Sequence, residues 1–301
     1  MHLSSSSGGR RYGEAMRESA TAAPHIDEFP VLRPGWTPRL VACDVDGTLL
    51  TTTHRLQPET IAAVARVRAR GTEVLLTTSR GPSVLWPVLR EMGLTDPASF
   101  IGSQGGVTGR YTDAGDLVVL DRHPMPLGLV RPVVDDALRS GIAVSWYAGG
   151  DWFVSHVDST IENEEAIVGV RAIVRDLSAE VAGPEKLMLI APTSDVEPLR
   201  DIAARLPAGL RAQISNPTYL EITRADVDKA EATRLYCARH GIDLTDVVAI
   251  GDGPNDLGLF ALAAVTAAPA SARPEVLAAA DFRTSGNDEG AVARALEALV
   301  P

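Results

Sequence analysis

Two aspartates at the end of an apolar run are the first residues whose types and spacing suggest chemistry. In "VACDVDGTLL", Asp44 and Asp46 stand two positions apart and are followed by Gly47 and Thr48. Side chains two positions apart in an extended chain point to the same side, so we expect the two carboxylates to converge. Such a pair can supply one group that attacks and a second that transfers protons. The stretch therefore indicates a reaction centre at the end of a buried strand.

Two later stretches bring further polar groups to the ends of strands. "LLTTSRG" contains Thr78 and Ser79, and "VVAIGDGPND" contains Asp252, Asn255 and Asp256. Ligands of an open parallel sheet bind beyond the carboxyl ends of its strands, so these groups are expected in one crevice. Clustered carboxylates repel one another unless they share a cation, and Mg²⁺, which takes oxygen ligands and bridges to phosphate, suits them.

The chain contains two lysines, and one of them is a candidate for the same crevice. Lys229 stands at the start of a predicted helix, where the helix dipole disfavours a cation. That cost and the scarcity of lysine favour a function for Lys229, whereas Lys186 is expected to be a surface residue of a strand. Together, a nucleophilic carboxylate, an acid–base carboxylate, a metal, a hydroxyl and a lysine match phosphoryl transfer through an aspartyl-phosphate.

Alternating strands and helices are predicted to position these groups. Strands are expected at 39–44, 72–80, 99–106 and 246–253, and helices at 58–71, 81–93, 228–241, 255–263 and 288–300. Continuous apolar strands that alternate with helices are typical of a parallel sheet covered on both faces. The expected class is α/β, with a Rossmann-like parallel-sheet core.

The middle of the chain has a different pattern. "IAVSWYAGGDWFVSH" predicts two strands around a Gly-Gly turn, and a strand, a helix and two more strands follow it. We therefore expect a flexible N-terminal extension at 1–37, a core at 38–121 and 216–301, and an inserted α+β cap domain at 122–215. Two alternatives stay open for Trp146, Tyr147, Trp152 and His156: they line a substrate pocket, or they pack inside this insertion.

Composition restricts the partners. The formal net charge of −11 argues against nucleic acid, which requires a positive surface. Two cysteines make no disulfide framework and suit a reducing cytoplasm. No apolar run approaches the roughly 18 to 20 residues needed to cross a bilayer. The expected partner is a small-molecule phosphate ester, and the chain is expected to be a monomer or a homodimer.

Four stretches in order, "DVDGTLL", "LLTTSRG", "EITRADVDKAEA" and "IGDGPNDLGLF", resemble the motifs of the haloacid dehalogenase superfamily of phosphatases. The long insertion and the tail after residue 268 resemble its Cof-type subfamily IIB. The likeness extends from residue 39 to the end. It implies a Mg²⁺-dependent phosphatase that acts on a sugar phosphate, a nucleotide or a phosphorylated cofactor.

The resemblance also implies roles for individual residues. Asp44 would be the nucleophile, and Asp46 would protonate the leaving oxygen and then activate the hydrolytic water. Thr78 would bind the phosphoryl oxygens, and Lys229 would neutralise their charge. Asp252 would bind Mg²⁺ together with Asp44 and the backbone carbonyl of Asp46. Asp256 would support the water molecules on the metal or Lys229. Asn255 would contact the phosphate or a residue that binds it.

Several positions depart from the subfamily pattern. Ser79 and Ala230 stand where glycines are usual, Gln104-Gly105-Gly106 replaces Asn-Gly-Ala, and Ser271 replaces an asparagine. These departures concern the phosphate loop and the substrate, since every catalytic group is present.

Two other functions fit the same motifs. A phosphosugar mutase would need clustered cations in its cap, and the segment 125–215 has no dense basic run. A catalytically silent binding protein on this fold would be expected to lose Asp44, Asp46, Lys229 or Asp252, and all four are present. Hydrolysis is therefore favoured.

Overall fold

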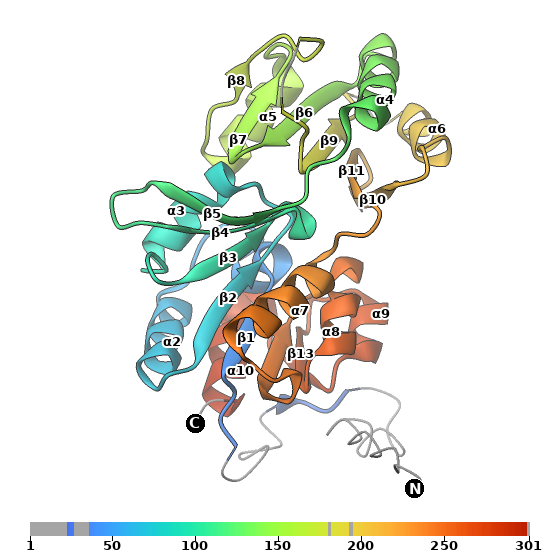
Figure 1. The fold of residues 1–301 in the computed structure, drawn as a ribbon. Coiled ribbons are helices and arrows are strands. Elements are labelled where there is room, and N and C mark those ends of the chain that lie inside the picture. The colour runs from blue at the N-terminus through green and yellow to red at the C-terminus, as the bar shows by residue number, and fades with distance from the viewer. Residues whose placement is uncertain (1–22, 27–35, 180–181, 193–194, 300–301) are drawn as a thin grey trace, which may run out of the picture. The chain divides into compact units, whose positions relative to one another are not determined.

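The structure is a computed structural model that describes residues 23–26, 36–179, 182–192 and 195–299 (Figure 1). The chain forms two compact units, Met1–Val74 with Cys237–Pro301 and Leu75–Tyr236.

The first unit is built on parallel strands. Its strands are β1 (Leu40–Cys43), β12 (Val247–Ile250), β13 (Val265–Pro269) and β14 (Phe282–Thr284), in the order β14-β13-β12-β1. All three neighbouring pairs are parallel, and Cys43 at the end of β1 lies opposite Ile250 at the end of β12. The residues of β1, β12 and β13 are buried, as expected for a parallel sheet with helices on both faces.

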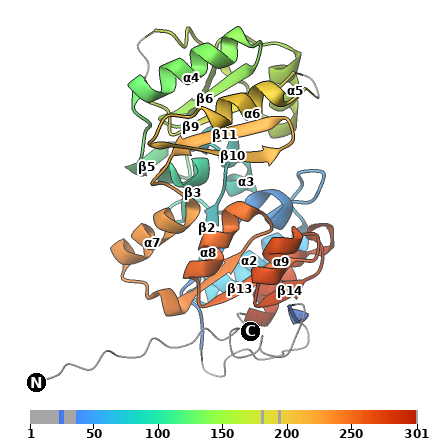
Figure 2. The ribbon, with the colours of Figure 1, turned by 90° about the vertical axis from the view of Figure 1, so that its right-hand side faces the viewer.

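Helices cover both faces of these strands (Figures 1 and 2). Among the described residues of this unit, these helices are α2 (Pro58–Ala69), α8 (Leu257–Leu262), α9 (Pro274–Ala279) and α10 (Ala291–Leu299). Helices α2 and α10 pack against each other on one face, and α8 and α9 pack on β12 and β13 on the other. Pro58 begins α2, where its fixed φ suits the first turn and its missing N–H costs nothing.

Strand β2 (Glu73–Thr77) begins in the first unit and ends in the second. There it pairs in parallel with β3 (Ser99–Gly102), which is followed by antiparallel β4 (Val107–Tyr111) and β5 (Leu117–Arg122). The second unit also contains α3 (Pro82–Glu91) and most of α7 (Lys229–His240). The strand expected at 99–106 ends at Gly102, because a short 3₁₀ turn follows at Ser103–Gly105.

The remaining part of the second unit is a six-stranded sheet. Its order is β10-β11-β9-β6-β7-β8, formed by β6 (Ala143–Ala148), β7 (Asp151–Val154), β8 (Ile173–Val174), β9 (Lys186–Ile190), β10 (Leu210–Asn216) and β11 (Tyr219–Arg224). The predicted hairpin is confirmed as β6 and β7, joined at Gly149 and Gly150, which both have positive φ. The predicted insertion contains five of these strands, and β11 follows it; its boundaries stay a prediction.

Two apolar clusters cover the two faces of this sheet. Helices α4 (Leu127–Arg139) and α6 (Glu197–Ala204) pack on the face that carries Trp146. Helix α5 (Ser159–Val168) and Val84 of α3 pack on the face that carries Tyr147 and Trp152. Neighbouring residues of a strand point to opposite faces, which explains why Trp146 and Tyr147 belong to different clusters.

The predicted N-terminal extension, 1–37, lies mostly outside the described residues. Within its described part, the backbone N–H of Arg283 in β14 donates to the carbonyl of Pro24 at 2.9 Å, and Ile26 is fully buried. These residues therefore join the edge of the first sheet. No helix in the described part of the chain is long and apolar enough to span a membrane.

Candidate active site

Three carboxylates lie together in the first unit. Each of Asp44, Asp252 and Asp256 offers one oxygen, and these oxygens all lie within 4.8 Å of one another. Asp44 follows β1 and Asp252 follows β12, its parallel neighbour, while Asp256 ends a 3₁₀ turn behind Asp252. Asp44 is 5% exposed and Asp256 is 0% exposed. The strand order thus delivers these three acids to one place; the roles given to them above stay predictions.

Short local contacts hold this carboxylate cluster (Asp44, Asp252 and Asp256) in position. The Thr48 hydroxyl donates to Asp252 Oδ1 at 2.8 Å, and the backbone N–H groups of Asp252 and Gly253 donate to Asp256 Oδ2 at 3.2 and 3.0 Å. Gly47 has φ +79°, and a Cβ at this position would lie 2.4 Å from Asp252 Oδ2. Glycine is therefore required here by the backbone conformation and by the close approach of the carboxylate.

The carboxylate cluster fits a divalent metal ion. Like charges that converge in a buried place disfavour ionisation unless a cation neutralises them. Carboxylate oxygens are the donors that hard divalent cations prefer. Asp44, Asp252 and Asp256 are the residues of this unit that would hold such an ion.

Asp46 lies apart from this cluster. The chain leaves the strand at Asp44 and turns through Val45–Leu49, with Gly47 in the left-handed region, so the two-residue period of a strand does not continue to Asp46. Asp46 Oδ1 lies 3.4 Å from His54 Nδ1, and its side chain is partly exposed. Asp46 is therefore close in sequence to Asp44, the candidate nucleophile. Its neighbour in space is His54, a residue that no sequence pattern indicated.

Asn255 belongs to the turn Pro254–Asp256 and is partly buried. A Cβ on Gly253 would lie 2.5 Å from Asn255 Oδ1, so this amide folds back over the glycine. Asn255 is thereby placed in the same turn as Asp256.

The predicted phosphate-binding residues Thr78 and Ser79 belong to the second unit. Thr78 follows β2 and is fully buried, and its hydroxyl accepts a hydrogen bond from the backbone N–H of Arg80 at 3.1 Å. Its own N–H donates to the carbonyl of Ile101 at 2.9 Å. Ser79 is half-buried. Thr78 is thus fixed at the carboxyl end of its strand, as expected.

Lys229 is the first residue of α7 and is 0% exposed. Asp228 caps the helix, because its carboxylate accepts from the N–H of Glu231 at 2.7 Å. Burial of a cation is costly, so a fully buried lysine at the positive end of a helix is a candidate functional group. The predicted position at a helix start is confirmed, and the role of Lys229 stays a prediction.

The loop Ser103–Gly106 connects these parts of the second unit. The backbone N–H groups of Gln104 and Ser103 donate to the carbonyls of Thr78 and Arg80 at 3.0 and 2.8 Å. A Cβ on Gly105 would lie 2.3 Å from the Asp228 carbonyl oxygen, next to Lys229. In the sequence this stretch stands out only as a departure from the subfamily pattern, and its two glycines were the signal for such close backbone contacts.

The expectation that Lys186 lies on the surface is wrong. Lys186 is 3% exposed, and its Nζ lies 3.6 Å from Glu221 Oε2 and 4.7 Å from the centroid of the Tyr147 ring. It begins β9, which is buried because it lies between β11 and β6 in the sheet. The scarcity of lysine was the signal that could have identified this position.

The aromatic side chains of the hairpin have different environments. Trp146 is fully buried in the cluster under α4 and α6. Trp152 is also buried and stacks on Tyr147, with ring centroids 6.0 Å apart and planes 11° from parallel. His156 is exposed and lies 2.9 Å from the Ser155 hydroxyl. Of the two possibilities left open for the tryptophans, packing inside the sheet is the one observed.

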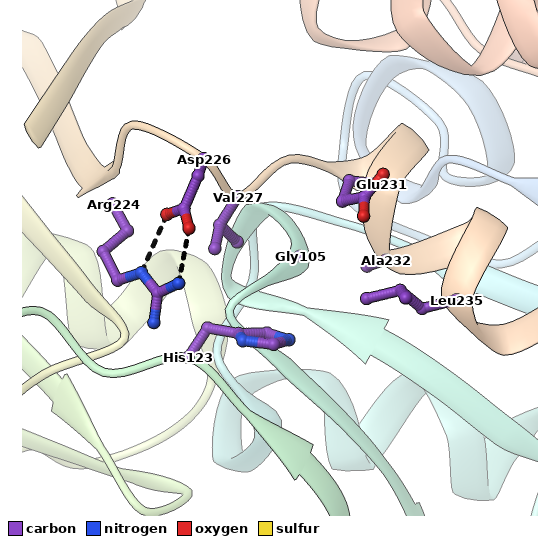
Figure 3. A pocket seen from close by; sticks show the side chains of 8 residues that line it. All are labelled: Gly105, His123, Arg224, Asp226, Val227, Glu231, Ala232 and Leu235. Atoms are coloured by element: carbon purple, nitrogen blue, oxygen red, sulfur yellow. Dashed lines mark hydrogen bonds and ion pairs between the residues drawn. The ribbon is translucent and has the colours of Figure 1, made fainter. Parts of the chain in front are cut away.

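A small pocket of the second unit is lined in part by Gly105 of the loop Ser103–Gly106 (Figure 3). It is lined by Gly105, His123, Arg224, Asp226, Val227, Glu231, Ala232 and Leu235. Arg224 donates two hydrogen bonds to the Asp226 carboxylate, at 2.8 and 2.6 Å, and they lower the pKa of Asp226 to about 2 (Figure 3). Glu231 accepts two hydrogen bonds from Arg234. Because these acids pair with arginines, the pocket differs in kind from the carboxylate cluster.

Comparison with known proteins identifies the family. A profile of the haloacid dehalogenase-like hydrolases matches residues 41–296. The chain is 26% identical to YxeH of Bacillus subtilis, whose name assigns it to the phosphatases, over 87% of this chain and 98% of that protein. It is 23% identical to the pyridoxal phosphate phosphatase YbhA of Escherichia coli, over 86% of this chain and 97% of that protein.

Solved structures share the fold. A haloacid dehalogenase-like hydrolase of Bacteroides thetaiotaomicron superposes with a TM-score of 0.77 at 22% identity, over 87% of this chain and 99% of the other. The subclass IIB sugar phosphatase BT4131 superposes with a TM-score of 0.73 at 20% identity, over 85% of this chain and 97% of the other. The predicted α/β class with a parallel-sheet core is confirmed. The chain belongs to the haloacid dehalogenase-like hydrolase family, as an enzyme of the phosphoric monoester hydrolase type.

Proposed function

We propose that this enzyme is a Mg²⁺-dependent phosphatase that hydrolyses a small phosphorylated metabolite through an aspartyl-phosphate on Asp44. The observation that carries the proposal is the convergence of Asp44, Asp252 and Asp256 within 4.8 Å. Phosphoryl transfer needs positioning and neutralisation of charge, and a cluster of hard oxygen donors beside a nucleophile provides for both.

The first unit supplies the reacting groups. A carboxylate oxygen of Asp44 attacks phosphorus, the bond between phosphorus and the leaving oxygen breaks, and Asp46 donates a proton to that oxygen. In the second half-reaction Asp46 removes a proton from water, whose oxygen attacks phosphorus and releases Asp44. Asp44, Asp252, Asp256 and the carbonyl of Asp46 would hold Mg²⁺, which neutralises phosphoryl charge when bound.

The remaining roles concern the oxygens of the phosphoryl group. Thr78 and Ser79 hydrogen-bond its oxygens, and Lys229 neutralises their charge. Both Thr78 and Lys229 are buried, which supports this assignment. The loop Ser103–Gly106 also contacts the backbone of Thr78 and that of Asp228, the residue before Lys229. Asn255, in the turn with Asp256, contacts the phosphoryl group or its neighbours.

Relatives suggest the range of substrates. Proteins 23% and 27% identical to this chain are named as phosphatases of pyridoxal phosphate and of HMP-PP, and BT4131 is named a sugar phosphatase. The substrate proposed here is accordingly a sugar phosphate, a nucleotide or a phosphorylated cofactor.

Composition supports a cellular compartment and a class of partner for this enzyme. Two buried free cysteines and a net charge of −11 support a reducing cytoplasm and a small-molecule substrate rather than nucleic acid. The enzyme is proposed to act as a monomer or a homodimer.

A panel of phosphate esters tests the proposal. Release of inorganic phosphate is measured for sugar phosphates, nucleotides, pyridoxal phosphate and acetyl phosphate, with Mg²⁺ and with EDTA. We expect turnover with Mg²⁺ and its reversible loss with EDTA. Hydrolysis at an equal rate by metal-free protein would contradict the metal assignment, and no phosphate release from any ester would contradict the reaction.

A further inference from the structure

The six-stranded sheet contains a buried ion pair that packing does not require. Lys186 and Glu221 are 3% and 4% exposed, and their charged atoms lie 3.6 Å apart. Desolvation of two charges costs several kcal/mol per ion, and apolar residues of similar volume often stabilise a fold as well or better. The pair is therefore better explained by a function of its charges than by stability.

The ion pair lies on the face of the sheet that borders the Thr78 loop. Lys186 of β9 is paired in register with Tyr147 of β6, so both side chains project from the same face. The Tyr147 ring covers Gly81, where an added Cβ would lie 2.6 Å from Cδ1 of the ring. Gly81 follows Thr78 by three residues. The Lys186 ammonium, which lies over this ring, is thus close to the predicted phosphate-binding residues.

Gln104 joins the ion pair to Thr78 directly. Its side-chain amide donates to Glu221 Oε2 at 3.1 Å, while its backbone N–H donates to the Thr78 carbonyl at 3.0 Å. Ser103 and Gln104 both have positive φ, +53° and +57°, although neither is glycine. The buried Ser103 hydroxyl has no hydrogen-bond partner among the described residues. Backbone strain and an unpartnered buried hydroxyl are both features that concentrate at binding sites.

We infer that Lys186 and Glu221, together with Gln104, are the specificity-determining residues of this enzyme and select an uncharged leaving group with neighbouring hydroxyls. The inference rests on the proposed phosphatase function. A hydroxyl can donate to the Glu221 carboxylate and accept from the Lys186 ammonium at the same time. The two charges compensate each other, so the pair offers no net attraction to a charged leaving group.

Substrate ranking tests the inference. kcat and KM are measured for a polyol phosphate (sorbitol 6-phosphate), a carboxylated ester (phosphoglycolate) and acetyl phosphate, with wild type, Lys186→Met, Glu221→Gln and the double variant Lys186→Met/Glu221→Met. The double variant removes both charges and is expected to fold, as buried ion pairs replaced by apolar residues usually do. We expect kcat/KM for the polyol phosphate to fall about 10- to 100-fold, the loss typical of hydrogen bonds to charged groups.

Acetyl phosphate and a control variant separate recognition from folding. Acetyl phosphate lacks hydroxyls, so its kcat/KM is expected to stay within about threefold of wild type. Glu185→Gln is the matched control: Glu185 is buried and directly precedes Lys186 of β9, but its carboxylate accepts hydrogen bonds from Arg122 and from the backbone N–H of Gly149. Its thermal unfolding temperature should fall while its substrate ranking stays that of wild type.

The outcomes are distinct. Preferential loss of the polyol phosphate in the double variant supports the inference, whereas equal losses for all three esters, or an unchanged ranking, overturn it. If wild type with Mg²⁺ hydrolyses neither these three compounds nor any ester of the wider panel, the phosphatase proposal itself fails. Activity that is retained but prefers phosphoglycolate contradicts only the assignment of the leaving group.

Discussion

Two groups of acidic side chains, one in each unit, have opposite surroundings. In the second unit, the buried carboxylate of Glu221 lies beside Lys186, and that of Glu185 accepts a hydrogen bond from Arg122 at 2.6 Å. Burial raises the pKa of Glu185, and the contacts with Arg122 oppose this shift. In the first unit, Asp44, Asp252 and Asp256 instead gather with one another.

This difference separates two uses of buried charge. An acid that is paired with a basic side chain of the same chain is already compensated and acts through orientation and recognition. Acids that converge on one another create a place for a cation from solution. Substitutions in the first unit should therefore act mainly on catalysis, and those in the second mainly on stability or on the choice of substrate.

The largest effect is expected for Asp44→Asn. The amide is a much weaker nucleophile than the carboxylate, so kcat should fall by about 10⁴-fold or more for every ester. Thermal unfolding of the variant should stay close to that of wild type. Asp46→Asn should instead leave a slowly hydrolysed phosphoenzyme, detectable by intact-mass measurement as one added phosphoryl group. Full activity in Asp44→Asn would exclude the covalent mechanism.

Asp252→Ala removes one oxygen donor from the carboxylate cluster. We expect a sharp rise in the Mg²⁺ concentration that gives half-maximal rate, or a loss of kcat of roughly 10²- to 10³-fold. Titration of activity with Mg²⁺ after EDTA treatment measures both. An unaltered Mg²⁺ dependence would remove Asp252 from the proposed metal site.

Trp152→Ala tests the second unit through packing. Loss of a buried tryptophan that stacks on Tyr147 should lower the free energy of unfolding by about 3 to 5 kcal/mol. Losses of activity should be similar for large and small esters, because this side chain packs on Tyr147 within an apolar cluster. His156→Ala, at an exposed position of the same hairpin, is the control and should change stability by less than about 0.5 kcal/mol. A change in substrate ranking for Trp152→Ala but not for His156→Ala would indicate that Trp152 lines the substrate pocket.

Gly47→Ala and Gly71→Ala form a matched pair within the first unit. Both glycines have positive φ, +79° and +89°, but a Cβ on Gly47 would meet Asp252 while a Cβ on Gly71 would meet nothing within 4 Å. Both variants should lose about 1 to 2 kcal/mol of stability from the left-handed backbone. In addition, Gly47→Ala should lower kcat/KM by about 10- to 100-fold by displacing the carboxylate. Equal activity in the two variants would show that the position of Asp252 is not critical.

The smallest effect is expected at the pocket of Figure 3. Hydrogen bonds from Arg224 lower the pKa of Asp226 to about 2, so the native state favours the ionised carboxylate. The resulting stabilisation is present above pH ~4, near the unfolded-state pKa, and is lost as the pH falls toward 2. Because Asp226 is exposed, Asp226→Asn should cost no more than about 1 kcal/mol at pH 7. Denaturant unfolding of both proteins at pH 7 and pH 3 measures the difference, which should shrink at the lower pH.

The positions of the residues proposed for catalysis could be predicted from the sequence better than those of the residues proposed for recognition. Asp44, Asp252 and Thr78 follow apolar strands, and the order of parallel strands determines where such strand ends lie. The direction of the Asp46 side chain could not be predicted, because the chain leaves the two-residue period of the strand at the turn Val45–Leu49, before it reaches Asp46. Lys186, Glu221 and Gln104 come together only through antiparallel pairing in the six-stranded sheet and through the strained loop Ser103–Gly106. Register and loop strain of this kind leave no periodic signal in one sequence.

The hydrogen bond between Pro24 and Arg283 has a consequence for self-association. Strand β14 is the outermost strand of its sheet, and an uncovered strand edge offers its backbone groups to any other extended chain. Pro24 and the buried Ile26 occupy that edge, with His25 bridged in parallel to Arg283. A protein shortened to begin at residue 38 would keep every residue proposed for catalysis. It would, however, leave the edge of β14 without Pro24 and Ile26, so two molecules could pair through their β14 strands.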